Sequence, residues 1–162
     1  YHAGHGDISI RPDIDRFDGQ TVHFNDGTSA EYDMILAATG YKLDYPFIDD
    51  GLLNWQGDAP HLFLNAMHPE RDDLFLLGMV EATGLGWQGR HDQAEMVVRY
   101  IKGLREGTPE ARELQQAKAQ EFDRATGGVN YLDLPRMAYY VDKATYLKAV
   151  RGWIRKLKGN RA

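Results

Sequence analysis

Apolar side chains repeat at helical spacing in the second half of the chain. From His91 onward the apolar positions lie three or four residues apart until Gly107, a residue type that commonly ends helices. The spacing predicts a helix over residues 91–107, with five residues on its apolar face: Ala94, Val97, Val98, Ile101 and Leu104.

Two further helices are predicted downstream. Residues 108–110, Thr-Pro-Glu, have the sequence of a helix start, with a capping hydroxyl, a proline at the first position and an acid in the first turn. That helix is expected to run from about Pro109 to Arg124 and to end before Gly127-Gly128. A last amphipathic helix is predicted from a single apolar stripe of six residues: Tyr146, Leu147, Val150, Trp153, Ile154 and Leu157.

The first half of the chain has the shorter period of β-strands. In residues 7–17, Ile8 and Ile10 alternate with polar neighbours, which is typical of a half-buried strand. Residues 21–24 lie between two Asp-Gly turn signals, at 18–19 and 26–27. A strand between two such turns predicts a β-meander.

Two other runs, MILAAT at 34–39 and LFLL at 74–77, are continuously apolar. Continuous apolarity is typical of a strand covered on both faces, as in a parallel sheet. Residues 45–69 contain Pro46, Pro60 and Pro69 and are predicted to form an extended loop region. The pattern therefore predicts an α/β fold with a short β-meander, two buried parallel strands and three helices.

Composition narrows the class of protein. The chain has 162 residues, 43% of them hydrophobic and 27% charged, which is ordinary for a soluble domain. Because cysteine is absent, disulfides, thiolate metal sites and a cysteine nucleophile are excluded. The formal net charge of -5 argues against a nucleic-acid partner, since such domains usually carry a basic surface.

Targeting signals are sparse. No apolar run approaches the roughly 20 residues that span a bilayer, and no secretory apolar segment is present, so we expect a cytoplasmic location. The chain opens on Tyr1 and not on Met, and it reaches a strand-like run almost at once. We interpret the sequence as a piece of a longer protein.

The stretch GLGWQG at 84–89 has the G-x-G-x-x-G spacing of a dinucleotide-binding turn. Six residues separate Leu77 from Gly84, whereas the fingerprint places its first glycine directly after the strand. A second helix, and not a second strand, is predicted to follow. We therefore reject the pyrophosphate turn. Two alternatives stay open: a flexible connecting loop, or a helix N-terminus whose N–H groups suit a partly negative ligand oxygen.

A more specific pattern lies in residues 22–48. There V-x-F-x-D-G at 22–27 is followed by D-x-x-x-x-A-T-G-Y at 33–41 and by Pro46-Phe47. This order resembles the flavin-containing monooxygenases and their N-hydroxylating and Baeyer–Villiger-type relatives. LFLLGM at 74–79, the pair Gln93-Ala94 and the tyrosine-containing segment 141–154 are also similar to that family. The resemblance covers most of the chain.

The resemblance implies the C-terminal portion of an NADPH- and FAD-dependent monooxygenase that inserts one oxygen atom from O2 into a small organic substrate. It implies that residues 1–44 end the NADPH domain and its linker strands, including the ATGY strand. Residues 45–162 would complete a Rossmann-like FAD-binding domain with a helical tail. The implied cofactor contacts are Ala38, Thr39, Gly40, Gly78, Thr83, Gly86 and Gln88. The implied partners are the remaining N-terminal part of the enzyme and the small-molecule substrate, and the resemblance allows a homodimer.

The chain also departs from the family pattern. The two strand–GxGxxG–helix fingerprints, one for FAD and one for NADPH, are absent, so the chain alone is expected to be inactive. No catalytic residue can be named. Two alternatives remain: a pyridine-nucleotide-dependent flavin reductase of the same architecture, and a non-catalytic interaction domain derived from it. Met79 speaks against the reductase, because reductases usually carry Asp at that position.

The remaining polar residues have simpler interpretations. The six histidines do not fall at metal-ligand spacing, so no metal site is predicted. Asp72 and Asp73 are expected to be solvated loop acids. The basic tail 151–161 is expected to dock its apolar stripe on its own protein and to leave its charges in water.

Overall fold

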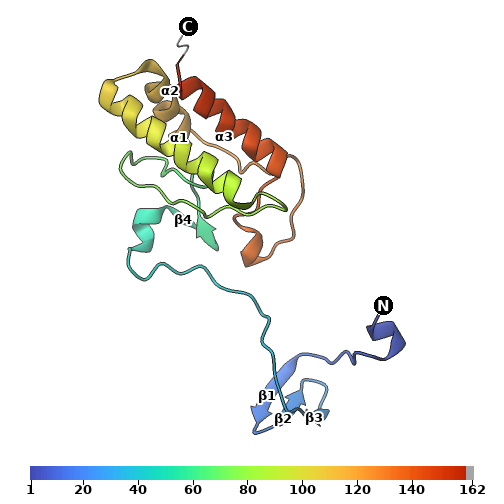
Figure 1. The fold of residues 1–162 in the computed structure, drawn as a ribbon. Coiled ribbons are helices and arrows are strands. Elements are labelled where there is room, and N and C mark those ends of the chain that lie inside the picture. Colours follow the sequence, from blue (N-terminus) through green and yellow to red (C-terminus); the bar gives the residue numbers. More distant parts are fainter. Residues whose placement is uncertain (160–162) are drawn as a thin grey trace. The chain divides into compact units, whose positions relative to one another are not determined.

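A computed structural model describes residues 1–159 (Figure 1). Contacts within the chain divide it into two compact units, Tyr1–Thr39 and Gly40–Ala162. The division falls inside the ATGY stretch. The assignment of residues 1–44 to the end of an NADPH domain and of residues 45–162 to an FAD-binding domain stays a prediction.

The first unit holds a short 3-10 turn, η1 (Ala3–His5), and three antiparallel strands in the order β1-β2-β3. The strands are β1 (Ile14–Asp18), β2 (Thr21–Phe24) and β3 (Ser29–Glu31). Gly19 and Gly27 turn the chain between them at φ values of 60° and 82°, which glycine adopts without strain. The predicted β-meander is confirmed, and β2 buries Val22 and Phe24 on one face.

The predicted strand at Ile8 and Ile10 is wrong. Both side chains are exposed and precede β1, which begins at Ile14. The hairpin turn sets the register, and β2 reaches only as far as Phe24, the partner of Ile14. Residues before Ile14 therefore have no opposing strand in the described part of the unit.

The two predicted buried parallel strands are not found. Within residues 1–159 both sheets are antiparallel, and residues 34–39 form no strand. Met34 is 84% exposed and Leu36 is 86% exposed, because no backbone or side chain of the described residues covers them. Phe75 makes one isolated antiparallel bridge, to Met67. The coarse α/β class holds, whereas the Rossmann-like parallel sheet is not observed.

The second unit begins with small elements and then becomes helical. The region predicted as an extended loop contains a 3-10 turn, η2 (Asp50–Leu53), and a hairpin of β4 (Trp55–Gln56) with β5 (Ala59–Pro60). The helices are α1 (Gly86–Glu106), α2 (Pro109–Lys118) and α3 (Lys143–Leu157), with a 3-10 turn η3 (Pro135–Met137) before α3. None of the described helices is long and apolar enough to cross a bilayer.

Local signals explain most helix ends. Gly107 ends α1 in the left-handed region at φ 69°, and the Thr108 hydroxyl caps α2 by accepting a hydrogen bond from the Ala111 N–H. Two ends differ from prediction. α1 begins five residues before His91, at Gly86 inside GLGWQG. α2 ends at Lys118 and not at Arg124, and beyond it Phe122 stacks on His61 with ring centroids 4.6 Å apart.

The core of the second unit lies between the helices and the segment 62–82. α1 and α3 run side by side, and α2 packs against both (Figure 1). The tail docks on its own protein as expected, because Ile154 is buried and Trp153 and Leu157 pack against the core; Arg161 lies outside the described residues. The helical part of the core consists of Met96, Val97, Tyr100, Ala111, Leu114, Tyr146, Val150 and Ile154.

Candidate functional site

The first turn of α1 leaves its backbone donors without a side-chain cap. Leu85, at the cap position, is itself in a helical conformation, and its side chain is buried. Gly84 and Gly86 lead the chain into the helix at φ values of 71° and 56°. The first N–H groups of a helix have no partner within the helix, so this end can donate hydrogen bonds to a partly negative group.

Gly78 lies beside α1, in a left-handed conformation with φ 93°. Its N–H donates to Oε1 of Gln93 at 2.8 Å, and its carbonyl accepts from the Val80 N–H at 2.8 Å. A Cβ atom placed on Gly78 would meet nothing within 4 Å. The backbone is therefore held from one side and open on another.

Gln93 is the centre of a buried neutral network, which we call the glutamine cluster. The Gln93 side chain is 0% exposed, and its Nε2 donates to the Asn65 carbonyl at 3.1 Å and to the Tyr146 hydroxyl at 2.9 Å. The Tyr146 hydroxyl donates in turn to the Leu64 carbonyl at 3.1 Å. The cluster joins α1, α3 and the segment before Gly78; its members are Gln93, Gly78, Tyr146 and the carbonyls of Leu64 and Asn65.

Gln88 is held by a charged pair in the first turns of α1. Its Nε2 donates to Oδ1 of Asp92 at 2.7 Å, and Oδ2 of Asp92 accepts from Nε of Arg151 at 2.7 Å. Burial would raise the pKa of Asp92, but the hydrogen bonds from Arg151 and Gln88 outweigh it and hold the pKa below its usual range. Asp92 is therefore a carboxylate that connects α1 to α3.

The structure brings four of the seven predicted cofactor contacts to one end of α1. Gly86 and Gln88 are in its first turn, Thr83 precedes it on the surface, and Gly78 is hydrogen-bonded to its second turn through Gln93. The other three, Ala38, Thr39 and Gly40, are exposed. Ala38 and Thr39 end the first unit, and Gly40 begins the second.

A second buried polar network, the lysine cluster, was not predicted from the sequence. The Lys118 side chain is 1% exposed, and its Nζ lies 3.0 Å from Oδ1 of Asp72. The prediction that Asp72 is a solvated loop acid is wrong, because its side chain is only 35% exposed and also accepts from the Tyr100 hydroxyl. The cluster consists of Lys118, Asp72, Tyr100, Gln115 and the carbonyls of His68, Pro69 and Arg71.

Both clusters had a signal in the sequence. Lys118 follows Ala111 and Leu114 at helical spacing, so it lies on the apolar face of its helix. Gln93 lies one turn before Met96 and Val97 in a run of buried residues of α1. A polar residue on a core-facing stripe predicts a buried hydrogen-bond partner, but the stripe does not say which segment supplies it.

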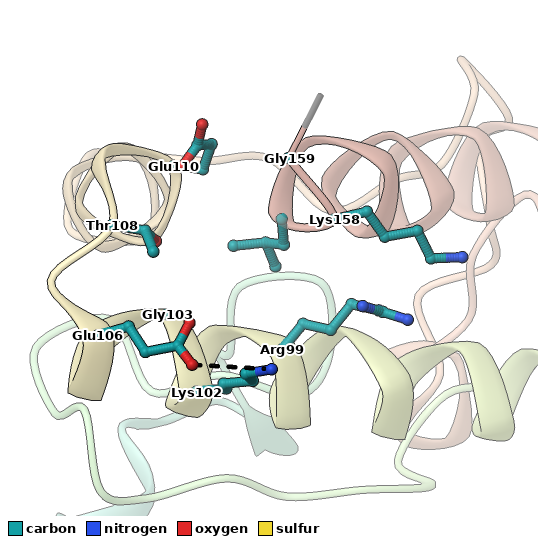
Figure 2. Close-up of a pocket in the computed structure, with 9 residues that line it drawn as sticks. Arg99, Lys102, Gly103, Glu106, Thr108, Glu110, Lys158 and Gly159 are labelled. Carbon is teal, nitrogen blue, oxygen red and sulfur yellow. Dashed lines mark ion pairs between the residues drawn. The ribbon is translucent and has the colours of Figure 1, made fainter. Parts of the chain in front are cut away.

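A groove of about 720 Å³ lies between the C-terminal half of α1, the start of α2 and the end of α3 (Figure 2). Its cations are already paired: Arg99 and Lys158 contact Glu95 at 2.7 and 3.4 Å, and Lys102 contacts Glu106 at 3.7 Å. Among residues 1–159, no three or more histidine, aspartate or glutamate side chains are grouped so that they could hold a metal ion.

Comparisons with known proteins converge on one family. The family described as flavin-binding monooxygenase-like matches residues 3–153. Flavin-containing monooxygenase 3 of Oryctolagus cuniculus is 28% identical over 141 residues, which is 79% of this chain and 27% of that protein. Flavin-containing monooxygenase 1 of Sus scrofa is 26% identical over 151 residues, 89% of this chain and 28% of that protein.

The match to the corresponding canine protein is shorter. Flavin-containing monooxygenase 3 of Canis lupus familiaris is 32% identical over 101 residues, 60% of this chain and 19% of that protein. No solved structure matches the chain significantly. The chain spans about a quarter of the length of the curated relatives that it matches over most of its own residues.

Proposed function

The chain belongs to the flavin-binding monooxygenase-like family, and we propose that it forms part of the FAD-binding region of an NADPH- and FAD-dependent monooxygenase. The reaction would insert one oxygen atom from O2 into a small organic substrate, by oxidation at nitrogen or sulfur or by Baeyer–Villiger-type insertion. The observation that carries the proposal is the family match over residues 3–153, which includes both the ATGY stretch and LFLLGM.

The α1 end fits a cofactor with a partly negative oxygen. When bound, FAD would supply the redox chemistry, with NADPH as the electron donor. The uncapped N–H groups at the start of α1 would donate to such an oxygen, and the helix dipole would favour negative charge there. Gly86 and Gly78 would leave room for close approach, since a Cβ on either would meet nothing within 4 Å.

The geometry also limits what individual residues can do. Because the Gly78 N–H is bonded to Gln93, Gly78 would contribute space and not a hydrogen-bond donor. One hydrogen of the Gln88 amide nitrogen is bonded to Asp92, so Gln88 would present its other amide hydrogen, its side-chain oxygen or its backbone N–H. Thr83 is exposed, and its hydroxyl is a further candidate contact.

Ala38, Thr39 and Gly40 would contact the adenosine and pyrophosphate end of FAD. Two small residues and a glycine at φ 80° allow a ligand to lie against backbone. The exposed apolar side chains at 34–36 support a second part of the proposal, in which this run becomes a buried strand when the rest of the enzyme covers it.

Activity would need partners beyond this chain. We propose that the glycine fingerprints for FAD and NADPH lie elsewhere in the same protein, and that the chain alone does not turn over substrate. The small-molecule substrate would bind where the other part of the enzyme completes the pocket. A homodimer stays a prediction that the molar mass in solution would test.

The test uses the protein that carries this segment, loaded with FAD. Oxidation of NADPH in the presence of methyl phenyl sulfide, N,N-dimethylaniline or cyclohexanone, with 18O-labelled dioxygen, should place one labelled oxygen in a product. NADPH oxidation without any labelled product would indicate the flavin reductase. Failure to bind FAD would favour the non-catalytic interaction domain.

Amide hydrogen exchange locates the contact. Saturation with FAD should slow exchange at residues 83–88, while amides at 147–150, in the interior of α3, serve as the internal control. Protection confined to other parts of the protein would argue that the α1 end does not contact FAD.

A further inference from the structure

We propose that Gln93 is a positioning residue, which holds the backbone of Gly78 in a fixed place beside the start of α1. The inference rests on the proposed function, because the group that would use this fixed backbone is FAD. It concerns a residue that does not itself reach the open side of the site, since Gln93 is fully buried.

The two ends of the Gln93 amide have different partners, and this fixes its orientation. Oε1 accepts from the Gly78 N–H, while Nε2 donates to the Asn65 carbonyl and the Tyr146 hydroxyl. A flipped amide would place its NH2 group against the Gly78 N–H and its oxygen against a carbonyl, leaving donors facing donors and acceptors facing acceptors. The arrangement therefore has one satisfied state.

Gly78 needs such support because of its conformation. At φ 93° the backbone is in a region that residues other than glycine rarely adopt. The hydrogen bond from the Val80 N–H to the Gly78 carbonyl closes a tight turn directly after it. A glycine at a turn has more conformational freedom than any other residue. A buried acceptor on a helix removes that freedom at one atom, the Gly78 nitrogen.

The open space around Gly78 distinguishes positioning from simple packing. A buried side chain that only filled the core would contact atoms that are covered on all sides. Gln93 instead accepts from the N–H of a residue whose Cα is open, since a Cβ placed on Gly78 would meet no atom within 4 Å outside its chain neighbours. The hydrogen bond thus fixes a surface on which a ligand could rest.

Asp92, which precedes Gln93 in α1, also holds a predicted cofactor contact. Asp92 accepts from the Gln88 side chain at 2.7 Å and is bonded to Arg151 of α3. Consecutive residues of α1 therefore hold two of the predicted cofactor contacts, Gln88 and Gly78, and both are connected to α3.

The test compares two variants in the protein that carries this segment. Gln93→Met keeps the side-chain length but removes the acceptor for the Gly78 N–H. Tyr146→Phe removes a hydroxyl from the other end of the same cluster and leaves the Gly78 bond in place. Both variants are measured without denaturant, at a temperature at which their unfolding curves show them to be fully folded.

Two readouts are taken, and neither depends on turnover. Amide exchange at Gly78 without FAD should be at least about tenfold faster in Gln93→Met, because one hydrogen bond protects that amide. The Kd for FAD, from quenching of flavin fluorescence, should rise about tenfold or more in Gln93→Met and stay within about threefold of the unsubstituted protein in Tyr146→Phe.

Each outcome decides the inference. An unchanged Kd in Gln93→Met, despite faster exchange at Gly78, would overturn the positioning role. Equal loss of FAD affinity in both variants would reduce Gln93 to a structural residue and would also overturn it. If the unsubstituted protein bound no FAD, the proposed function would fail, and with it the assigned ligand. Faster exchange at Gly78 in Gln93→Met would then still support the holding of the turn.

Discussion

The lysine cluster and the glutamine cluster both fasten helices to the segment 62–80, but they differ in charge and in what lies beside them. In the lysine cluster, Lys118 Nζ is enclosed by three carbonyls at 2.9–3.0 Å and by Asp72. In the glutamine cluster every group is neutral, and Gly78 is open on one side. The lysine cluster therefore encloses a charge, whereas the glutamine cluster lies beside the open space at Gly78.

The difference separates stability from site geometry. Removing the buried Lys118 ammonium leaves three carbonyls and a partly exposed carboxylate without their donor, which costs more than losing a neutral hydrogen bond. We therefore expect the lysine cluster to contribute more to the free energy of unfolding. The glutamine cluster, with weaker bonds but an open neighbour, would instead control the shape of the α1 end.

The largest expected effect is that of Lys118→Met. The variant leaves three carbonyls without their donor and Asp72 without its cation, and it should lower the free energy of unfolding by about 3 kcal/mol. Urea unfolding followed by circular dichroism measures the change. Lys102→Met, at an exposed pair with Glu106, is the control and should change the free energy by less than about 0.5 kcal/mol. Equal effects would contradict the comparison.

Sequence reasoning recovered the parts of the fold that local signals set. The Thr108 cap, the Gly107 stop and the Asp-Gly turns each act within a few residues, so they could be read directly. The runs at 34–39 and 74–77 could not, because continuous apolarity indicates that a segment is covered but not what covers it. Residues 34–36 are exposed because nothing among the described residues covers them.

The candidate site shows the same limit. GLGWQG was correctly placed near a helix start, and the structure moves that start into the motif itself, at Gly86. The pairing of Gln93 with Gly78, and of Lys118 with Asp72, joins residues far apart in the chain. In each pair a polar residue on an apolar helix face indicates that a buried partner exists. Which residue is the partner depends on the folded structure and cannot be read from the stripe.

The second prediction compares two buried tyrosines, beginning with Tyr100→Phe. The Tyr100 hydroxyl donates to the Asp72 carboxylate, a charge-assisted bond, so its loss should lower the free energy of unfolding by about 1.5–3 kcal/mol. Denaturant titration at pH 7 measures the change. An effect below that of the other tyrosine variant would reverse the proposed ranking of the clusters.

The matching variant in the glutamine cluster is Tyr146→Phe. Its hydroxyl accepts from Gln93 and donates to the Leu64 carbonyl, both neutral groups, so the expected loss is about 1 kcal/mol. Under the same conditions as Tyr100→Phe, the shift in the midpoint of unfolding should be smaller. Each variant loses one oxygen atom from a fully buried side chain. Tyr146 loses two hydrogen bonds to neutral groups and Tyr100 loses one to a carboxylate, so a larger effect of Tyr100→Phe would have to come from the charge of its partner.

The smallest expected effect is a dependence on pH. Burial would raise the pKa of Asp72, but hydrogen bonds from Tyr100, Lys118 and Gln115 hold it below its usual range. A carboxyl whose pKa is lowered by folding stabilises the folded state fully above its unfolded pKa of about 3.9, and this contribution is lost as pH falls through the folded pKa.

The two tyrosine variants should therefore diverge in acid. Tyr100→Phe removes a donor that favours the charged form of Asp72, so the pKa of Asp72 moves up toward its usual range. The destabilisation by Tyr100→Phe should stay constant above about pH 5 and shrink below about pH 4, where the carboxylate that the hydroxyl favours becomes protonated. The Tyr146 hydroxyl bonds only neutral groups, so the effect of Tyr146→Phe should not change over that interval. Unfolding curves from pH 3 to pH 7 measure both. Parallel curves would show that the Tyr100 bond owes nothing to the charge of Asp72, and the distinction between a charged and a neutral cluster would then no longer explain their difference in stability.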